Sequence, residues 1–371
     1  MDCAQTTLLS NKEYLQNFNK KVFRQRIPLS GSIDLTNRCN LRCIHCYLGD
    51  KQAVPWTLNQ EIDTGKFISV IDEITEAGCL NLLITGGEPL SRRDFPEIYT
   101  HAKKNGLIIT LFTNGTLITE SILKLFEELP PHNIEISLYG ATAATYEKIT
   151  GVPGSFRQCI DGIERLKDAR INLKLKTMLM RTNSHEFYDI RDIAKKFDLK
   201  FRSDAALFPC FNGNRDPVGL RIPPQEAIEK EFSDKERFSD WVEYFERMKG
   251  APVSDRLYTC GAGNTSFHID PYGILKPCVM VRGYNFDLAE GSFSAGWHDI
   301  IPKIREKKAG SLFAACAQCE KKALCDYCPA FFELENGKAD KYSEYLCAIG
   351  HRRFEAIKAA HLSGGISEVS V

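Results

Sequence analysis

Between residues 31 and 210, short apolar runs alternate with longer amphipathic stretches. The runs expected to form strands are SIDLT from residue 32, LNLLIT from 80, LIITLFT from 107, IEISLYG from 134, INLKLKTMLM from 171 and LKFRSDAALF from 199. In the stretch from Thr57 to Gly78, which Thr57 is placed to cap, Ile62, Phe67 and Ile71 recur at helical spacing. Six successive strand–helix units predict an α/β fold with a parallel sheet and helical crossovers.

Right-handed crossovers of this kind close a parallel sheet into a full or partial (β/α)6 barrel, and ligands then bind at the carboxyl ends of its strands. The informative residues lie just after successive strands. They are the cysteine-rich loop 39–46 after the first, GGEPL (86–90) after the second, TNGT (113–116) after the third, and residues 137–140 at the end of the fourth. We therefore expect one functional site at this end of the barrel.

The composition along the chain changes after residue 210. Residues 211–222 are rich in turn formers and read as a linker, and a charged helix is expected over about 223–249. The expected division is an N-terminal extension (1–30), the barrel (31–210), a linker and bridging helix (211–255), a cysteine-rich domain (256–350) and a C-terminal tail (351–371). Because the cysteine-rich part is short of long strands, we expect its fold to depend on what the cysteines hold.

Composition narrows the class of protein. Hydrophobic residues make up 43% of the chain and charged residues 26%, a balance typical of a globular protein with a sizeable core. Lysine plus arginine equals aspartate plus glutamate at 48 each, which disfavours nucleic acid as the main partner. The N-terminus lacks the apolar segment of a signal peptide, and no run reaches the ~18–20 apolar residues of a membrane span. We expect a cytoplasmic protein without a membrane partner.

Fourteen cysteines in a cytoplasmic chain favour metal binding, because that compartment keeps thiols reduced. Ten of them form two groups: Cys39, Cys43 and Cys46 near the N-terminus, and Cys260, Cys278, Cys316, Cys319, Cys325, Cys328 and Cys347 in the last third. The other four, Cys3, Cys79, Cys159 and Cys210, are scattered and read as buried or free thiols.

The first group has the spacing C-x3-C-x2-C. Thiolates this close can converge on one metal ion, such as zinc completed by His45 or a distant ligand, or on an iron–sulfur cluster. A cluster held in this way would have one iron without a protein ligand, and such an open site is where chemistry can happen. Three unrelated thiols are the remaining alternative.

This loop, placed after the first barrel strand, resembles the signature of the radical S-adenosylmethionine (SAM) enzymes. The resemblance implies that Cys39, Cys43 and Cys46 hold a [4Fe–4S] cluster whose fourth iron is chelated by SAM. GGEPL resembles the family's second signature, and implies that Gly86 and Gly87 let the backbone approach SAM while Glu88 accepts from its ammonium group. Ser137 matches a position whose hydroxyl contacts SAM in several members; a serine bonding its own backbone is the alternative.

The chain departs from the family pattern at two positions. The common SLDG reads SLYG, with Tyr139 in place of the acid. The arginine that some members use to bind the SAM carboxylate corresponds to Thr150, so that ligand is unassigned, with Lys176 as a candidate. His45 occupies a slot that usually holds an aromatic residue beside the adenine.

The second cysteine group differs from a zinc ribbon, because its two C-x2-C pairs are separated by only five residues. It resembles the SPASM extension of radical SAM enzymes that modify peptides and proteins, apart from one residue missing before Cys328. The resemblance implies two auxiliary clusters. One is expected on Cys316, Cys319, Cys325 and Cys347, and the other on Cys260, Cys278 and Cys328. The latter lacks a fourth thiolate; we expect an open iron there, with Cys210 as the alternative ligand.

The resemblance implies an enzyme that cleaves SAM reductively and abstracts hydrogen from a peptide, with a flavodoxin or ferredoxin as electron donor and a separate precursor-recognition protein. Three alternatives stay open. They are action on a small molecule or tetrapyrrole, a non-catalytic iron–sulfur or zinc protein, and a sulfatase maturase, although Val279 stands where that class places a catalytic aspartate. Sequence leaves open the substrate, the bond made or broken and the oligomeric state.

Overall fold

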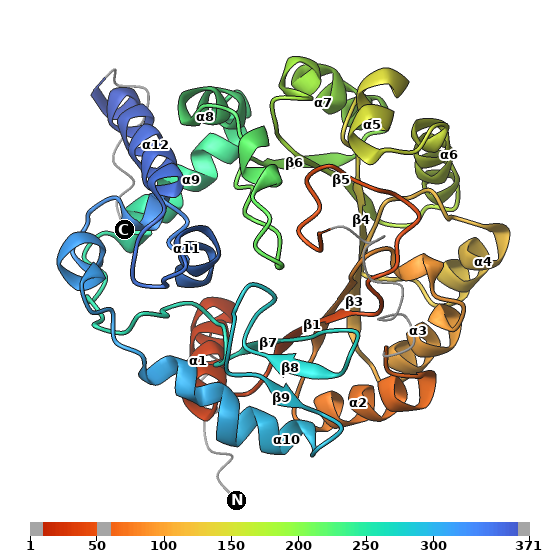
Figure 1. Cartoon of the computed structure of the whole chain (residues 1–371), viewed down its shortest axis with the longest axis horizontal. Coiled ribbons are helices and arrows are strands. Elements are labelled where there is room, and N and C mark those ends of the chain that lie inside the picture. The colour runs from red at the N-terminus through yellow and green to blue at the C-terminus, as the bar shows by residue number, and fades with distance from the viewer. Residues whose placement is uncertain (1–9, 50–60, 363–371) are drawn as a thin grey trace, which may run out of the picture.

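The computed structural model describes residues 10–49 and 61–362 as one nine-stranded sheet surrounded by helices (Figure 1). The strands are β1 (Ser30–Asp34), β2 (Asn81–Thr85), β3 (Ile108–Thr113), β4 (Asn133–Ser137), β5 (Leu173–Met178), β6 (Lys200–Asp204), β7 (Ser266–Ile269), β8 (Ile274–Lys276) and β9 (Phe286–Asp287). Their order is β6-β5-β4-β3-β2-β1-β7-β8-β9. The six expected strands are thus present and neighbour one another in chain order.

Strands β1 to β6 pair in parallel throughout. In the described chain β6 ends the sheet, and the other edge of β1 pairs with β7 instead of closing a ring. The predicted partial (β/α)6 barrel is therefore confirmed. The pairing of β7 was not predicted: this short strand from the cysteine-rich region extends the sheet in parallel, and β8 and β9 continue it in antiparallel fashion.

The crossover helices form an outer arc around the sheet (Figure 1). They are α2 (Thr64–Glu76), α3 (Phe95–Lys104), α4 (Glu120–Glu128), α5 (Ala143–Thr150), α6 (Ser155–Asp168) and α7 (Phe187–Lys196). Asp63 caps α2 by accepting from Lys66 N, so this helix begins later than expected, and Thr57 lies outside the described residues. Buried side chains such as Phe67 on α2 and Ile84 on β2 form the main apolar core between helices and sheet.

The remaining helices are α1 (Asn11–Gln25), α8 (Pro224–Phe232), α9 (Lys235–Met248), α10 (Phe293–Ala295), α11 (Pro329–Asn336) and α12 (Glu344–Leu362). The single charged helix expected over 223–249 is two helices, because the chain breaks at Ser233 and Asp234 and the latter caps α9. Within residues 10–49 and 61–362, none of the helices has the length and apolar character that crossing a bilayer requires.

The cysteine-rich region has an apolar cluster of its own. Leu257, Ile304, Leu312 and Phe332 are among its buried members, and Cys278, Cys316 and Cys328 pack against it. Hydrophobic burial therefore contributes to the fold of this region.

Candidate functional site at the carboxyl ends of the strands

The opposite face of the parallel sheet, away from the crossover helices, is polar. In the strand register, Glu135 of β4 pairs with Phe112 of β3 on one side and with Lys174 of β5 on the other. Two residues further along, Ser137, Lys176 and Arg202 are aligned across β4, β5 and β6. Side chains alternate along a strand, so these residues share the face that a barrel encloses. A charged inner face toward the carboxyl ends is typical of a binding site rather than of a packed barrel centre.

The three-cysteine loop that comes after β1 is fixed on two sides, to helix α5 and to the residue that follows β3. On one side, Arg42 N donates to Thr150 O at 2.8 Å, and Ile44 N donates to Ile149 O at 3.0 Å. On the other, the Asn114 side chain donates to Asn40 Oδ1 at 2.9 Å. The cysteines themselves are half-buried. The loop thus presents its thiols from a fixed backbone at the carboxyl end of the sheet.

The GGEPL segment packs directly against this loop. Gly87 N donates to Thr36 O and Glu88 N to Arg38 O, each at 2.7 Å. A Cβ on Gly87 would lie 2.1 Å from Arg38 O, and one on Gly86 would lie 2.5 Å from Thr36 O. The close approach of the two loops therefore requires both glycines. From the sequence we expected these glycines to make room for SAM, whereas here they make room for another segment of the protein.

The carboxylate of Glu88 is completely buried. Its Oε1 accepts from Thr113 Oγ1 at 2.8 Å and from Leu90 N at 3.1 Å, and its Oε2 accepts from Asn114 N at 2.7 Å. Donors from two strand ends thus hold the charge in place. Glu88 connects the second and third loops of the site, and its negative charge is of the kind that an ammonium group pairs with.

Tyr139, which departs from the family pattern, lies beside His45. The Tyr139 and His45 rings meet edge to face with centroids 4.6 Å apart, and the Tyr139 hydroxyl hydrogen-bonds with the Ser137 side chain. Burial raises the pKa of Tyr139 well above its usual range. Thr150 is buried, and its hydroxyl lies 2.8 Å from Ser155 Oγ, so its side chain has a structural partner. Tyr139 replaces an acid with an uncharged aromatic ring beside the cysteine loop.

Lys176 extends from β5 over the Phe112 ring, with Nζ 2.9 Å from the ring centroid and 3.9 Å from Glu135 Oε2. Burial lowers the pKa of the Lys176 ammonium well below its usual value, although the charge of Glu135 acts in the opposite direction. The side chain is therefore held on the inner face, one strand away from Ser137.

A buried acid and histidine lie on the same inner face, and sequence reasoning did not identify them. Asp34 Oδ2 is 3.7 Å from His268 Nε2, and Ser32 Oγ is 2.9 Å from His268 Nδ1. Burial raises the pKa of Asp34 to about 7 and lowers that of His268 to about 3. The pair depends on the β1–β7 contact, so only the polar alternation within SIDLT could have indicated Asp34.

Four of the tail cysteines line one cavity of about 180 Å³: Cys316, Cys319, Cys325 and Cys347. Burial raises the pKa of Cys325 to about 12, and the other three thiols act in the same direction. Converging sulfurs around a cavity are the donor set that an iron–sulfur cluster requires. Among the side chains described here, no three His, Cys, Asp or Glu residues are grouped closely enough to hold a single metal ion.

The other three tail cysteines are also neighbours. Burial raises the pKa of Cys328 to about 12, and the nearby thiols of Cys278 and Cys260 add to this effect. Cys328 Sγ accepts from Phe331 N at 3.5 Å, and Cys278 Sγ accepts from Met280 N at 3.4 Å. Cys210 instead donates its thiol to Cys46 O at 3.3 Å, which places it against the three-cysteine loop.

An open parallel barrel with a cysteine loop and a glycine loop at its carboxyl end belongs to the class of α/β enzymes that bind their cofactors at strand ends. Residues 33–194, which make up most of the barrel, match the family model of the radical SAM superfamily. Members of this superfamily use SAM together with a [4Fe–4S] cluster, and the cysteine-rich C-terminal region fits auxiliary clusters.

Three known proteins illustrate the similarity. An AdoMet-dependent heme synthase of Methanosarcina barkeri is 27% identical over 80% of this chain and 90% of its own length. A PqqA peptide cyclase of Rhodopseudomonas palustris is 25% identical over 91% of this chain and 92% of its own length. The crystal structure of Streptococcus suis SuiB bound to S-adenosylmethionine superposes with a TM-score of 0.67 and 16% identity, covering 94% of this chain and 83% of SuiB. The last likeness establishes the fold alone.

Proposed function

We propose that this protein is a radical SAM enzyme that modifies a peptide. In the proposal, residues 31–210 form the catalytic barrel and residues 256–350 the auxiliary-cluster domain. When bound, the cluster and SAM supply a 5′-deoxyadenosyl radical that abstracts hydrogen from the substrate. The chain's own residues bind and orient both reactants and keep water away from them.

The cysteine loop, through Cys39, Cys43 and Cys46, would hold the SAM-binding cluster. Its backbone hydrogen bonds to α5 and the side-chain hydrogen bond between Asn114 and Asn40 support this role, because they fix the loop before any cofactor binds. Gly86, Gly87 and Glu88 would form the neighbouring wall, where the negative charge of Glu88 suits the SAM ammonium. Ser137 and Lys176 are adjacent in register and would face the rest of the cofactor, Lys176 toward its carboxylate.

The tail cysteines would hold two auxiliary clusters. The shared cavity supports one cluster on Cys316, Cys319, Cys325 and Cys347. The second would be held by Cys260, Cys278 and Cys328 with one iron open to a further ligand. The hydrogen bond of Cys210 to the other loop supports leaving it out of this set. A flavodoxin or ferredoxin would supply electrons, and a separate recognition protein would present the precursor peptide.

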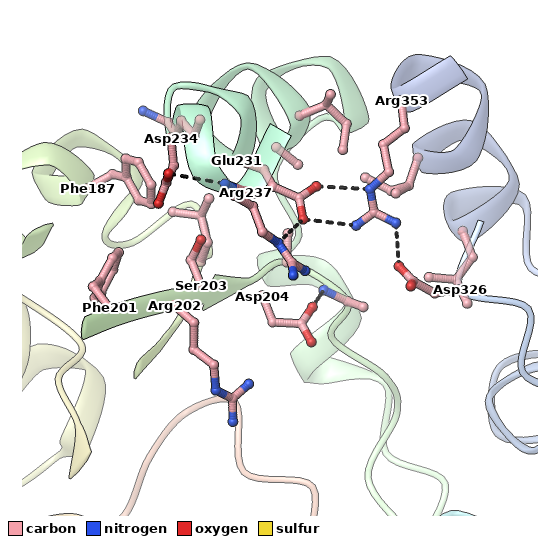
Figure 2. Close-up of a pocket in the computed structure, with 18 of the residues that line it drawn as sticks. Phe187, Phe201, Arg202, Ser203, Asp204, Glu231, Asp234, Arg237, Asp326 and Arg353 are labelled. Carbon is pink, nitrogen blue, oxygen red and sulfur yellow. Dashed lines mark hydrogen bonds and ion pairs between the residues drawn. The ribbon is translucent and has the colours of Figure 1, made fainter. Parts of the chain in front are cut away.

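One observation carries the choice of a peptide. A cavity of about 700 Å³ runs along seven consecutive residues, 200–206, of the edge strand and its extension, and it reaches Cys328 of the second auxiliary set (Figure 2). A cavity beside a strand edge suits an extended chain, and its lining includes Cys328. The PqqA peptide cyclase, similar over nearly the whole chain, acts on a peptide by its name.

A second candidate function is action on a tetrapyrrole. It is favoured by the heme synthase of Methanosarcina barkeri, which this chain matches over 90% of that protein's length. The cavity of about 700 Å³ beside β6 has room for either a peptide segment or a tetrapyrrole.

One assay distinguishes the two candidate functions. The anaerobically reconstituted protein is incubated with SAM, a reductant and either short peptides encoded near its gene or iron coproporphyrin III. Mass spectrometry measures 5′-deoxyadenosine and the mass of each substrate. We expect a peptide to lose hydrogen atoms in step with 5′-deoxyadenosine formation. Conversion of the porphyrin with unchanged peptides would establish the second candidate and refute the first.

A further inference from the structure

The edge strand β6 borders the 700 Å³ cavity with its open edge. All seven residues from 200 to 206 line the cavity, although alternate side chains point to opposite faces of the sheet. Because residues of both faces border the cavity, the cavity lies along the edge of the strand. The opposite wall comes from α8, α9 and the tail, including Met280, Phe331 and Arg353 (Figure 2).

The backbone groups on this edge are available for pairing. Asp204 O accepts from Leu179 N at 2.7 Å, so Asp204, together with Lys200 and Arg202, directs its backbone toward β5. Phe201 and Ser203 therefore direct N–H and C=O into the cavity, since direction alternates along a strand. In the described part of the chain neither has a backbone partner there. The next outward carbonyl, Ala205 O, accepts from Tyr345 Oη at 3.3 Å, which closes the edge at that end.

Native proteins normally protect an open strand edge by covering it or placing charges on it. Here the covering helices leave a cavity along β6, although Phe201 packs against the apolar cluster that includes Ile228 of α8. Residues 200–204 span about 13 Å of strand, enough to pair with a segment of similar length. The arrangement is that of a sheet edge kept open for an added strand.

The charges around the edge select among peptides. Three arginines near Asp204 already have carboxylate partners: Arg202 donates to Glu135, Arg237 to Glu231, and Arg353 to Glu231 and Asp326. Figure 2 shows the contacts of Glu231 with Arg237 and Arg353 on the cavity wall, with Asp204 nearby. Asp204 is exposed to the cavity, and among the described contacts its carboxylate accepts only from Ala206 N, at 2.7 Å. Among the described residues Asp204 makes no direct ion pair; burial raises the pKa of its carboxyl, and the charge of the nearby Arg353 acts in the opposite direction.

We propose that an extended segment of the substrate peptide binds as an added strand on the open edge of β6, with a lysine or arginine side chain paired to Asp204. The proposal rests on the proposed function, because it takes the substrate to be a peptide. It also explains how a peptide would be delivered, since the same cavity reaches Cys328 at one side and the carboxyl end of β6 at the other.

The test measures binding without SAM or reductant, so it can fail or succeed independently of turnover. The full-length reconstituted protein is titrated with a fluorescein-labelled synthetic peptide of alternating threonine and lysine. Two variant peptides are compared with it: one with glutamate in place of lysine, and one N-methylated on alternate amides, which cannot pair along one edge. In the protein, Ser203→Pro removes an outward N–H, with Ser203→Thr as its control, and Asp204→Asn removes the charge, with Asp240→Asn on the cavity rim as its control.

We expect N-methylation, Ser203→Pro, Asp204→Asn and the glutamate peptide each to weaken binding by about tenfold or more, as loss of a buried charged or backbone contact does. The two control variants should bind like the unchanged protein. If the N-methylated peptide binds equally well, strand addition is wrong even if Ser203→Pro fails to fold. Equal affinity for the glutamate peptide would refute the role of Asp204. Binding of iron coproporphyrin III with no peptide binding would overturn both parts.

Discussion

Among single residues, two buried carboxyl groups near the strand ends have opposite surroundings. Glu88 accepts hydrogen bonds from Leu90, Thr113 and Asn114, so its charge is compensated although it is completely buried. Asp34 is 2% exposed, and its Oδ1 has no hydrogen-bond partner. A buried charge without partners is costly, so Asp34 holds a proton more tightly than an exposed acid does.

The first prediction concerns Glu88→Gln. The amide puts an NH₂ group where an oxygen now faces N–H and O–H donors, so at least one buried hydrogen bond is lost. We expect the free energy of unfolding to fall by about 1–3 kcal/mol and SAM affinity to fall as well. Thermal unfolding and equilibrium SAM binding check this, with Glu97→Gln on the exposed face of α3 as control. A variant with unchanged stability and unchanged affinity would remove Glu88 from the site.

The second prediction concerns the pH dependence of stability. The pKa of Asp34 is raised to about 7, so its contribution to stability is lost as the pH rises from about 4 through 7. The pKa of His268 is lowered to about 3, so its contribution acts in the opposite direction below about pH 6.5. Above about pH 6.5, only the loss of the Asp34 contribution still changes the stability with pH. Asp34→Asn should therefore improve the melting temperature relative to the unchanged protein more at about pH 8 than at about pH 5.5.

Thermal scans of both proteins at the two pH values measure this difference directly. Asp161→Asn on the surface of α6 is the control for the same chemical substitution away from the site. A pH-independent difference for Asp34→Asn would show that this carboxyl titrates normally.

Among the elements, the site is assembled from loops that hold one another. The loop after β1 bonds to the GGEPL segment, to α5 and to the end of β3. The glycines at 86 and 87 make the closest of these contacts possible. The loops therefore form one connected unit at the carboxyl ends of four neighbouring strands, from β1 to β4.

The third prediction concerns Gly87→Ala. The added Cβ would be placed 2.1 Å from Arg38 O and 2.7 Å from Asn37 O, so the two loops must separate. We expect about 1–3 kcal/mol of destabilisation and weaker SAM binding. Gly219→Ala is the control, because no atom lies within 4 Å of a Cβ placed there. The two variants are compared by thermal unfolding and SAM titration, and equal behaviour would show that the loops tolerate separation.

Across the whole molecule, local sequence patterns were enough to predict the barrel. Short apolar runs indicated the six parallel strands, and the strand before the cysteine loop indicated where that loop lies. The strand β7 could not be predicted, because SFHI is only four residues long and its pairing with β1 joins segments more than 230 residues apart. The same distance hid the Asp34–His268 contact, and the cavity beside β6 depends on how α8, α9 and the tail pack.

The proposed activity depends above all on residues 39–46 binding the cluster that cleaves SAM, separately from the tail. The most direct measurement is iron content and 5′-deoxyadenosine formation in the Cys39→Ala, Cys43→Ala, Cys46→Ala triple variant after anaerobic reconstitution. We expect iron to fall from roughly 12 to roughly 8 atoms per chain, with SAM cleavage abolished. Continued formation of 5′-deoxyadenosine by the triple variant would contradict this role of the cysteine loop.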